Sequence, residues 1–582
     1  MNRAKPIGSV LLSLLLFLPS LAPAEVTDPF LRQTVSAIDS WNFSQVKDAL
    51  DTQGAAAAAD LAHLDGPRIV SVASCRQFVR FFSGIRTPTH EQRETLAWLA
   101  EQPHLMPVLM SAVSSTDSPR RVLDLVAMLR AATYDQLDNW PDLATALIVV
   151  WDKSPATDGT GFQPKFAPDR PVRLFSYFTD PRTPVRFDLH KLAWQLDVYI
   201  VDLKVTEDEM HWATQKYLNN YSIASAYFDI TYDDRAFFNG DPKKISTHDY
   251  TLQNLLQYGG VCVEQAYYAE QVAKSLGIPA CMCGSAGGGA GGVGHAWLGI
   301  VENSNHFFAW DFDQGRYTDD LYWSADITDP QTHEKLTDAD VGLLTDLQKV
   351  DSDTRLLSAA LLRLTDLVAG RQRFDIAMRE IEVCPGNRPA WLSLAEMGAD
   401  NRLTPAQTEQ LGAAIDRYLL QSYPDFALQV MIRTISSQTP LTEVDTLDRI
   451  GQLFPSRPDL RARVRLAQAD LLVNQHRDDD AFRALTDILA SDMNAGAIIL
   501  QAMDRIDKLM RAHDNLPGLA RLYSQTWPRM PAPDKSSYVY STPYYVVGKV
   551  YLKLLEDLGD QSDAQNVRNR LMQIIPDGAE LR

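Results

Sequence analysis

The residues best suited to chemistry begin at Cys262, which directly follows Tyr258-Gly259-Gly260-Val261. Two glycines end the preceding segment, and the stretch from 263 to 276 has the apolar periodicity of a helix, so the cysteine is predicted to begin that helix. A helix N-terminus carries partial positive charge, which favours a thiolate, and we expect Cys262 to be a nucleophile near neutral pH. The backbone N–H groups of Cys262 and Val263 could then stabilise a developing oxyanion.

A base and an acid follow along the chain. His295 stands in Gly294-His295-Ala296-Trp297, at the start of an apolar run that is typical of a strand. The next strand, from 307 to 313, carries Asp311 and Asp313, whose spacing of two predicts that both face the same side of the sheet. One of them could accept the Nδ1–H of His295 and fix its tautomer. The spacing leaves open which aspartate does so.

The order of these motifs resembles the core of the transglutaminase-like superfamily of Cys-His-Asp acyl-transfer enzymes. The similarity extends from about 250 to 317 and includes Gly-Val-Cys at a helix start, Ile278-Pro279 after the helix, Gly-His-Ala-Trp, and a Trp-containing strand that ends in Asp. It implies a papain-like α+β fold in which Cys262 is the nucleophile, His295 the base and an aspartate the third catalytic residue.

The resemblance does not choose between the aspartates. Asp313 stands at the strand end, where the family's acid usually lies, whereas the interval to Asp311 suits members with a short hairpin. Neither is followed by the Pro and small residue that often come after the family's acid. Tyr227 is a candidate for the upstream aromatic residue that completes the oxyanion hole in relatives. The calcium requirement of some animal relatives is not implied.

These residues need a mixed helix and strand framework. Alternation of apolar and polar residues predicts strands at 199–205 and 228–233, with a helix at about 209–217 between them. The glycine-rich stretch 284–294 lacks the Gly-Lys-Ser/Thr ending of a phosphate-binding loop and is interpreted as a flap beside His295 or a connector. The middle third is therefore predicted to be α+β.

Helical segments are predicted on both sides of this core. Apolar periodicity favours helices from 25 to about 154, and Gly and Pro cluster in a linker at 158–170. Pro389, Pro424 and Pro458 precede helical runs at intervals of 35 and 34 residues, and Met493-Asn494 continues the phase. That period is typical of helix-turn-helix solenoids such as tetratricopeptide repeats, the alternative being an irregular helical array with chance spacing.

The expected architecture is thus an α+β multidomain protein. It comprises a signal peptide (1–24), a helical N-terminal domain (25–157), a transglutaminase-like catalytic domain (171–335) and a TPR-like α-solenoid (340–582). The first segment has Arg3 and Lys5, then an apolar run too short to span a bilayer, then Ala22-Pro23-Ala24, which together indicate a cleaved secretory signal. We expect a secreted or periplasmic protein with no membrane attachment after cleavage.

Composition narrows the function classes. The 582 residues include 55 Lys and Arg against 74 Asp and Glu, for a formal charge of −19, which disfavours nucleic acid as a partner. Five cysteines are an odd number in an exported chain, so at least one should be free or paired between molecules. The His residues show no metal-site spacing, and no metal or cofactor is predicted.

The functional prediction is an exported cysteine acyl-transfer enzyme that acts on protein or peptide amide bonds, as a protease, a deamidase or a cross-linking enzyme. In each case Cys262 would form a thioester, and water or a second amine would take the acyl group. The alternative is a non-catalytic protein-interaction scaffold that binds a protein partner through the C-terminal repeats.

Overall fold

The structure is a computed structural model that describes residues 28–60, 65–134, 136–156, 160–162, 164–285, 294–304, 307–316, 324–435, 440–491, 497–533, 539 and 542–575. The predicted signal peptide at 1–24 lies outside these residues. So do Met493, Asn494 and most of the glycine-rich stretch, from 286 to 293.

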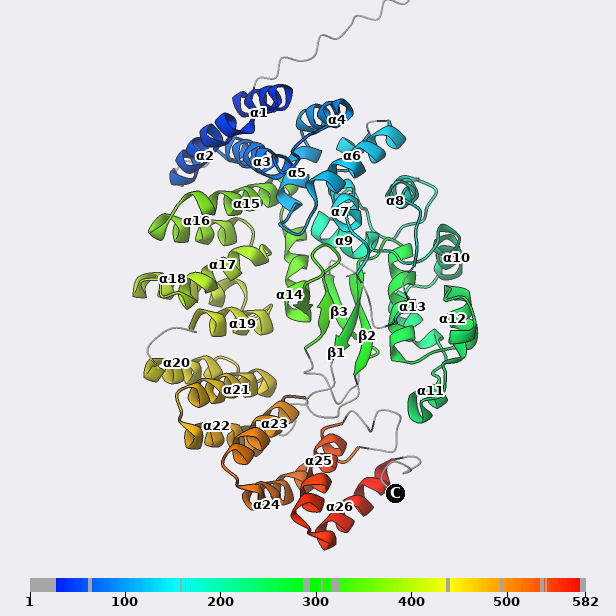
Figure 1. The fold of residues 1–582 in the computed structure, drawn as a ribbon, viewed down its shortest axis with the longest axis vertical. Coiled ribbons are helices and arrows are strands. Elements are labelled where there is room, and N and C mark those ends of the chain that lie inside the picture. The colour runs from blue at the N-terminus through cyan, green and yellow to red at the C-terminus, as the bar shows by residue number, and fades with distance from the viewer. Residues whose placement is uncertain are drawn as a thin grey trace, which may run out of the picture.

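One antiparallel sheet lies at the centre of the molecule (Figure 1). Its strand order is β3-β2-β1-β4-β5, so β3 and β5 are the edge strands. The strands are β1 (Ala280–Ser285), β2 (His295–Ser304), β3 (Phe307–Gln314), β4 (Asp326–Thr328) and β5 (Lys335–Thr337). The predicted strands after His295 are confirmed, and the described chain is helix-rich α+β.

Helices around this sheet complete the middle of the chain. They are α8 (Arg170–Thr179), α9 (Trp194–Val201), α10 (Glu207–Tyr217), α11 (Asp234–Asn239), α12 (Leu252–Tyr258) and α13 (Cys262–Ser275), and the short α14 (Asp338–Gly342) lies beside β3. The buried helix α13 packs against β1 and β2. Just after its end stands Gly277, whose φ of +68° allows the N–H of Ile278 to donate to the carbonyl of Ala273, 3.1 Å away. The chain then turns into β1.

The N-terminal helices pack directly on this middle region. They are α1 (Pro29–Ser40), α2 (Phe43–Ala59), α3 (Gly66–Phe82), α4 (His90–Ala100), α5 (Leu105–Ala112), α6 (Pro119–Thr133) and α7 (Pro141–Trp151). The largest hydrophobic core runs from Phe30 in α1 to Ile376 and includes both regions. Trp151 also donates its Nε1–H to the carbonyl of Val201 at 3.0 Å. The division into separate domains at 157 and 171 therefore stays a prediction.

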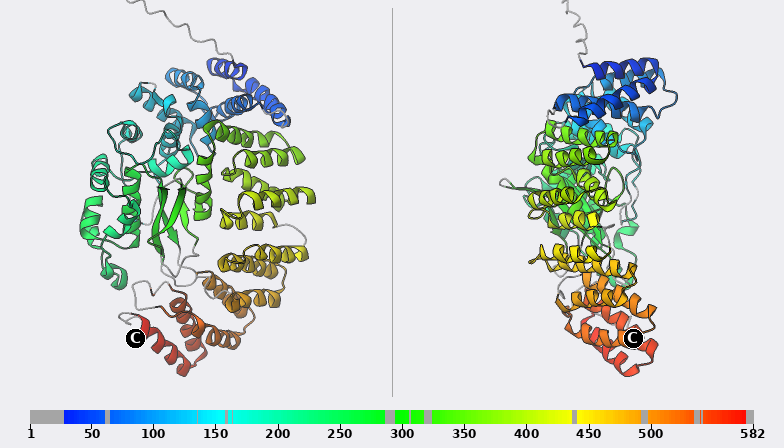
Figure 2. Two further views of the ribbon diagram at one scale, coloured as in Figure 1. Left: turned by 180° about the vertical axis from the view of Figure 1, so that it is seen from behind. Right: turned by 90° about the vertical axis from the view of Figure 1, so that its left-hand side faces the viewer.

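The C-terminal half is a curved array of helix pairs beside the sheet, stacked one above another in the side view of Figure 2. Its helices are α15 (Ser352–Leu364), α16 (Gly370–Val383), α17 (Arg388–Ala399), α18 (Pro405–Tyr418), α19 (Pro424–Ile435), α20 (Pro440–Gln452), α21 (Pro458–Asn474), α22 (Asp478–Ser491), α23 (Ala497–Ala512), α24 (Leu516–Thr526), α25 (Pro543–Leu558) and α26 (Gln561–Ile574). Pro389, Pro424 and Pro458 lie in the first turns of α17, α19 and α21, and a TPR-like solenoid stays a prediction. Within the described residues, no helix is both long and apolar enough to cross a membrane.

Two strand predictions are wrong. The stretch 199–205 belongs to α9 and to the coil after it, and 228–233 comprises the last two residues of a 3₁₀ helix, Ile223–Asp229, and the coil after it. From Leu196 to Val201 every residue of α9 is buried. The alternation of apolar and polar residues there therefore does not mark one buried and one exposed face, as it would in a half-buried strand. At 228–233 the only described pairing is a parallel bridge from Tyr232 to Gly260, and this bridge contributes to the placement of Cys262.

Candidate active site

Two glycines fix the position at which α13 begins. Gly259 has a φ of +77°, and a Cβ there would lie 2.3 Å from the carbonyl oxygen of Thr231. The N–H of Gly260 donates to that oxygen at 3.0 Å, and the N–H of Asp233 donates to the carbonyl of Gly260 at 2.8 Å. Hydrogen bonds thus hold the backbone just before Cys262. The prediction that this residue begins a helix is confirmed.

A buried carboxylate completes the helix start. Glu264 accepts the N–H of Val261 at 2.9 Å and pairs with Lys243 at 2.6 Å. The carboxylate satisfies a backbone donor that would otherwise lack a partner at the helix N-terminus. It also brings a negative charge close to the Cys262 sulfur, and no sequence motif pointed to this ion pair.

His295 enters the same site from the first residue of β2. The residue is 6% exposed, and its Nε2 lies 2.7 Å from the carbonyl oxygen of Gly315. A carbonyl only accepts, so Nε2 carries the proton and Nδ1 holds the lone pair of the neutral ring. Nδ1 is therefore the nitrogen that could take a proton from a thiol.

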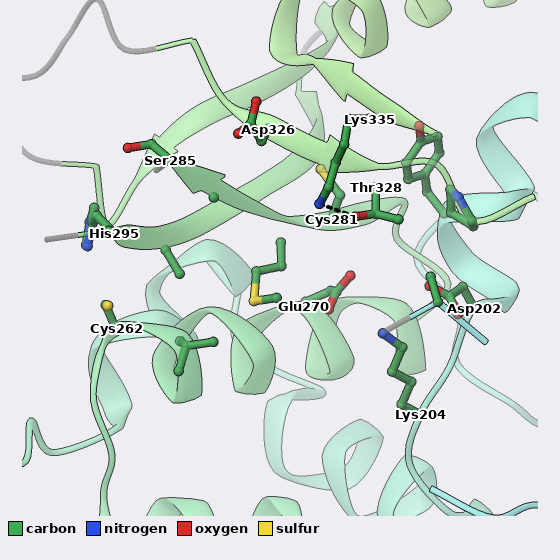
Figure 3. A pocket seen from close by; sticks show the side chains of 18 of the residues that line it. Asp202, Lys204, Cys262, Glu270, Cys281, Ser285, His295, Asp326, Thr328 and Lys335 are labelled. Carbon is green, nitrogen blue, oxygen red and sulfur yellow. Dashed lines mark hydrogen bonds between the residues drawn. The ribbon is translucent and has the colours of Figure 1, made fainter. Parts of the chain in front are cut away.

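Cys262 and His295 lie at one end of a groove of about 600 Å³ between α13 and the sheet (Figure 3). The groove extends from them along α13 toward Glu270 and Lys204. Cys262 is 8% exposed, and the N–H groups of Ala296 and Val263 form hydrogen bonds with its sulfur. The structure therefore brings the predicted nucleophile and base together, and adds Ala296 as a contact of the sulfur.

Burial reverses the expected ionisation of the thiol. Desolvation raises the pKa of Cys262, and the negative charge of Glu264 raises it further. The hydrogen bonds from Ala296 and Val263 and the charge of Lys243 act in the opposite direction but are outweighed. The prediction that the helix N-terminus would make Cys262 a thiolate near neutral pH is thus wrong, because the sulfur is too poorly hydrated.

Burial also keeps His295 neutral. Desolvation lowers the pKa of His295 from 6.5 to about 4, against the opposite effect of the hydrogen bond to Gly315. At neutral pH the resting pair is consequently a thiol beside a neutral imidazole. Such a pair needs the imidazole to remove the proton as the sulfur attacks.

The two aspartates have other partners. Asp311 accepts the N–H of Asp313 at 2.8 Å and the side-chain amide of Gln314 at 2.9 Å. The Asp313 side chain is 70% exposed and lies 3.6 Å from Arg316. The register of β2 and β3 shifts between Leu298 and Ile300, and this bulge interrupts the regular alternation on which the prediction of a shared face was based. The hydrogen bond that the structure describes for the His295 ring is to the Gly315 carbonyl, and a catalytic role for either aspartate stays a prediction.

Tyr227 braces the strands that carry these groups. Its hydroxyl donates to the carbonyl of Ala296 at 2.9 Å, and its ring lies against Gly315, where a Cβ would come within 2.4 Å of the ring. This side chain thus fixes the residue after His295 and the residue that accepts from it. The structure therefore describes Tyr227 as a contact of the backbone at Ala296 and Gly315, and its part in an oxyanion hole stays a prediction.

All five cysteines are free and buried. In the part of the chain that the structure describes, no three His, Cys, Asp or Glu side chains gather as a metal site would require.

The lowered pKa of His295 predicts an acid-sensitive fold. Between pH 6.5 and 4 the unfolded chain protonates this residue and the folded chain does not, so stability falls as the pH decreases through that window. The loss attributable to His295 should approach about 3 kcal/mol at its lower end. Denaturant unfolding at pH 7.5 and 4.5 should show a smaller pH effect for His295→Gln than for the unchanged protein. Equal pH effects in the two proteins would contradict the prediction.

No protein-family model, curated protein or solved structure matches the chain.

Proposed function

We propose that this protein is an exported cysteine acyl-transfer enzyme of transglutaminase-like type that acts on amide bonds of protein or peptide substrates. One observation carries the proposal: Cys262, at the first turn of α13, and His295, at the first residue of β2, share one end of a groove. A papain-like core is part of the proposal, supported by the packing of α13 on β1 and β2. Export is supported by the sequence pattern of 1–24 alone.

The chemistry follows from the neutral resting pair. As the sulfur of Cys262 attacks the carbonyl carbon, its proton passes to Nδ1 of His295. Backbone N–H groups at the start of α13 are the candidates to stabilise the oxyanion that forms. Collapse of this intermediate breaks the C–N bond, His295 returns the proton to the leaving amine, and a thioester remains on Cys262. Water or a second amine then takes the acyl group.

The test is direct detection of the acyl-enzyme. Purified protein is incubated with a glutamine-containing peptide library and a labelled primary amine, and intact mass and peptide mapping follow the label and any cleavage. We expect an adduct on Cys262 that hydroxylamine removes, and no adduct in Cys262→Ala. Cleavage indicates a protease, loss of ammonia without cleavage a deamidase, and amine incorporation a cross-linking enzyme. Equal product from Cys262→Ala would overturn the proposal.

A second candidate, a protein-interaction scaffold, is favoured by a different hollow. This space of about 780 Å³ lies between the edge strand β3 and the repeat helices, with Trp310 and Phe312 on one wall and Tyr423 and Phe426 on the other. Aromatic side chains in a concave surface suit a protein partner. The two functions are compatible, because this hollow does not include Cys262 or His295.

A further inference from the structure

The groove that holds Cys262 ends in a cluster of buried charges. Lys274, three turns along α13, lies 2.8 Å from Glu270 and 3.6 Å from Asp202, so two carboxylates compensate its charge. Across the groove, Lys335 of β5 donates to the hydroxyl of Thr328 at 2.8 Å (Figure 3). The charged residues of this wall are Lys204, Lys274, Lys335, Asp202, Glu270 and Asp326, a balanced set.

Lys204 lies at the far end of this groove, where its backbone is hydrogen-bonded to two side chains of α13. Its backbone N–H donates to Gln271 at 2.7 Å, and its carbonyl accepts the hydroxyl of Tyr267 at 3.3 Å. Gln271 lies nine residues after Cys262, which corresponds to roughly 14 Å along the helix axis. An extended peptide covers that distance in about four residues.

A second hollow of about 720 Å³ lies next to the first one. Ala156 and Lys204 contribute to the walls of both. The described charged residues of the second wall are Arg121, Lys153, Lys165, Lys204 and Asp152. Lys153 is compensated by Asp117 at 2.8 Å and Asp152 at 3.4 Å, and Arg121 and Lys165 bring two further positive charges to this wall.

This cationic wall contrasts with the rest of the molecule. The chain has a formal charge of −19, so an acidic ligand is repelled by most of the protein. Apolar side chains, Trp151, Phe162 and Phe166, line the same hollow and offer packing area to a bound chain. Charge and shape together favour an extended acidic segment of polypeptide over a basic one.

We propose that the two adjoining grooves bind an acidic stretch of the polypeptide substrate, beginning about four residues from the amide that Cys262 attacks. The inference rests on the proposed function for its register, because it counts residues from Cys262. It assigns Arg121 and Lys165, which come from α6 and from the segment before α8, as residues that determine substrate specificity.

Binding to Cys262→Ala tests this proposal without any need for turnover. Fluorescence anisotropy compares labelled peptides that carry one glutamine and, four to seven residues away on either side, a block of glutamates or a matched block of glutamines. At low salt at least one of the two acidic peptides should bind about tenfold tighter than its neutral counterpart, since each exposed charge pair contributes a modest part. The preference should shrink at 0.5 M salt, because salt screens exposed charges.

Charge reversal localises the effect. Arg121→Glu combined with Lys165→Glu should remove the acidic preference and favour the same peptide with a lysine block. Arg371→Glu is the matched control, because Arg371 is exposed on α16, far along the chain from the groove, with 88% of its side chain accessible. Equal affinity for acidic and neutral peptides in the starting protein would overturn the proposal, as would an equal loss of preference in the Arg371→Glu control.

Failure of this inference is distinguishable from failure of the proposed function. If acidic peptides bind more tightly but the unchanged protein forms no acyl-enzyme, the basic groove stands as a binding site and the acyl-transfer reaction is refuted. If acidic and neutral peptides bind with equal affinity and react with equal kcat/KM, the acyl-transfer reaction stands and the acidic preference is refuted.

Discussion

Cys262→Ser should lower kcat/KM for amide substrates at least about a thousandfold, while the protein stays folded. The reason is that a weak base, the His295 imidazole, would have to remove the proton of a weak acid, the serine hydroxyl. Burial lowers the pKa of His295 to about 4, so this imidazole is a poor acceptor for the proton of a serine hydroxyl. A thiol is more acidic than a hydroxyl and its sulfur is intrinsically more nucleophilic, which is why the site is suited to cysteine.

His295→Gln should produce a loss of similar size, because the glutamine keeps a donor toward Gly315 but provides no group to accept the thiol proton. The matched control is Cys281→Ser, which exchanges another buried thiol in the wall of the same groove. Steady-state kinetics on the peptides identified by acyl-enzyme mapping, with circular dichroism of each variant, gives the comparison. A Cys262→Ser protein with a tenth of the starting kcat/KM, or a Cys281→Ser protein as impaired as Cys262→Ser, would contradict the assignment.

The sequence predicts the elements around Cys262 well, because local signals and tertiary contacts agree there. Gly259 and Gly260 mark a break, and the periodicity after them gives the helix that the structure shows. The strands at 295–304 and 307–314 were predictable because the run of apolar residues is interrupted only by a short polar turn. The register shift opposite Gly299 has no such signal, so the spacing of the aspartates predicts a shared face that the bulge interrupts.

The electrostatics of the site could not be predicted from sequence. A helix N-terminus lowers a thiol pKa only if the sulfur keeps enough solvent or enough donors, and Cys262 is too buried for the N–H groups of Ala296 and Val263 to prevail. The hydrogen bond from His295 to the carbonyl of Gly315 is unpredictable from sequence for a different reason. Every residue has a backbone carbonyl, so a contact of this kind leaves no mark on the sequence.

Gly315→Ala should lower kcat/KM about a hundredfold through a residue that carries no reactive group. Gly315 has a φ of +84°, and an added Cβ would lie 2.4 to 2.6 Å from three carbons of the Tyr227 ring. That ring cannot swing aside easily, because its hydroxyl is bound to the carbonyl of Ala296. The backbone at Gly315 must move, and its carbonyl then no longer holds Nε2 of His295 in place.

A second glycine separates this effect from ordinary backbone strain. Gly559, after α25, has a φ of +76°, and a Cβ there would meet nothing within 4 Å. Gly559→Ala should therefore cost about 1 kcal/mol of stability from its left-handed backbone and leave kcat/KM unchanged. If Gly315→Ala stays folded but loses activity, while Gly559→Ala keeps it, the loss does not come from a left-handed backbone alone and points to the His295 contact. Full activity in Gly315→Ala would show that the imidazole keeps its orientation without the carbonyl.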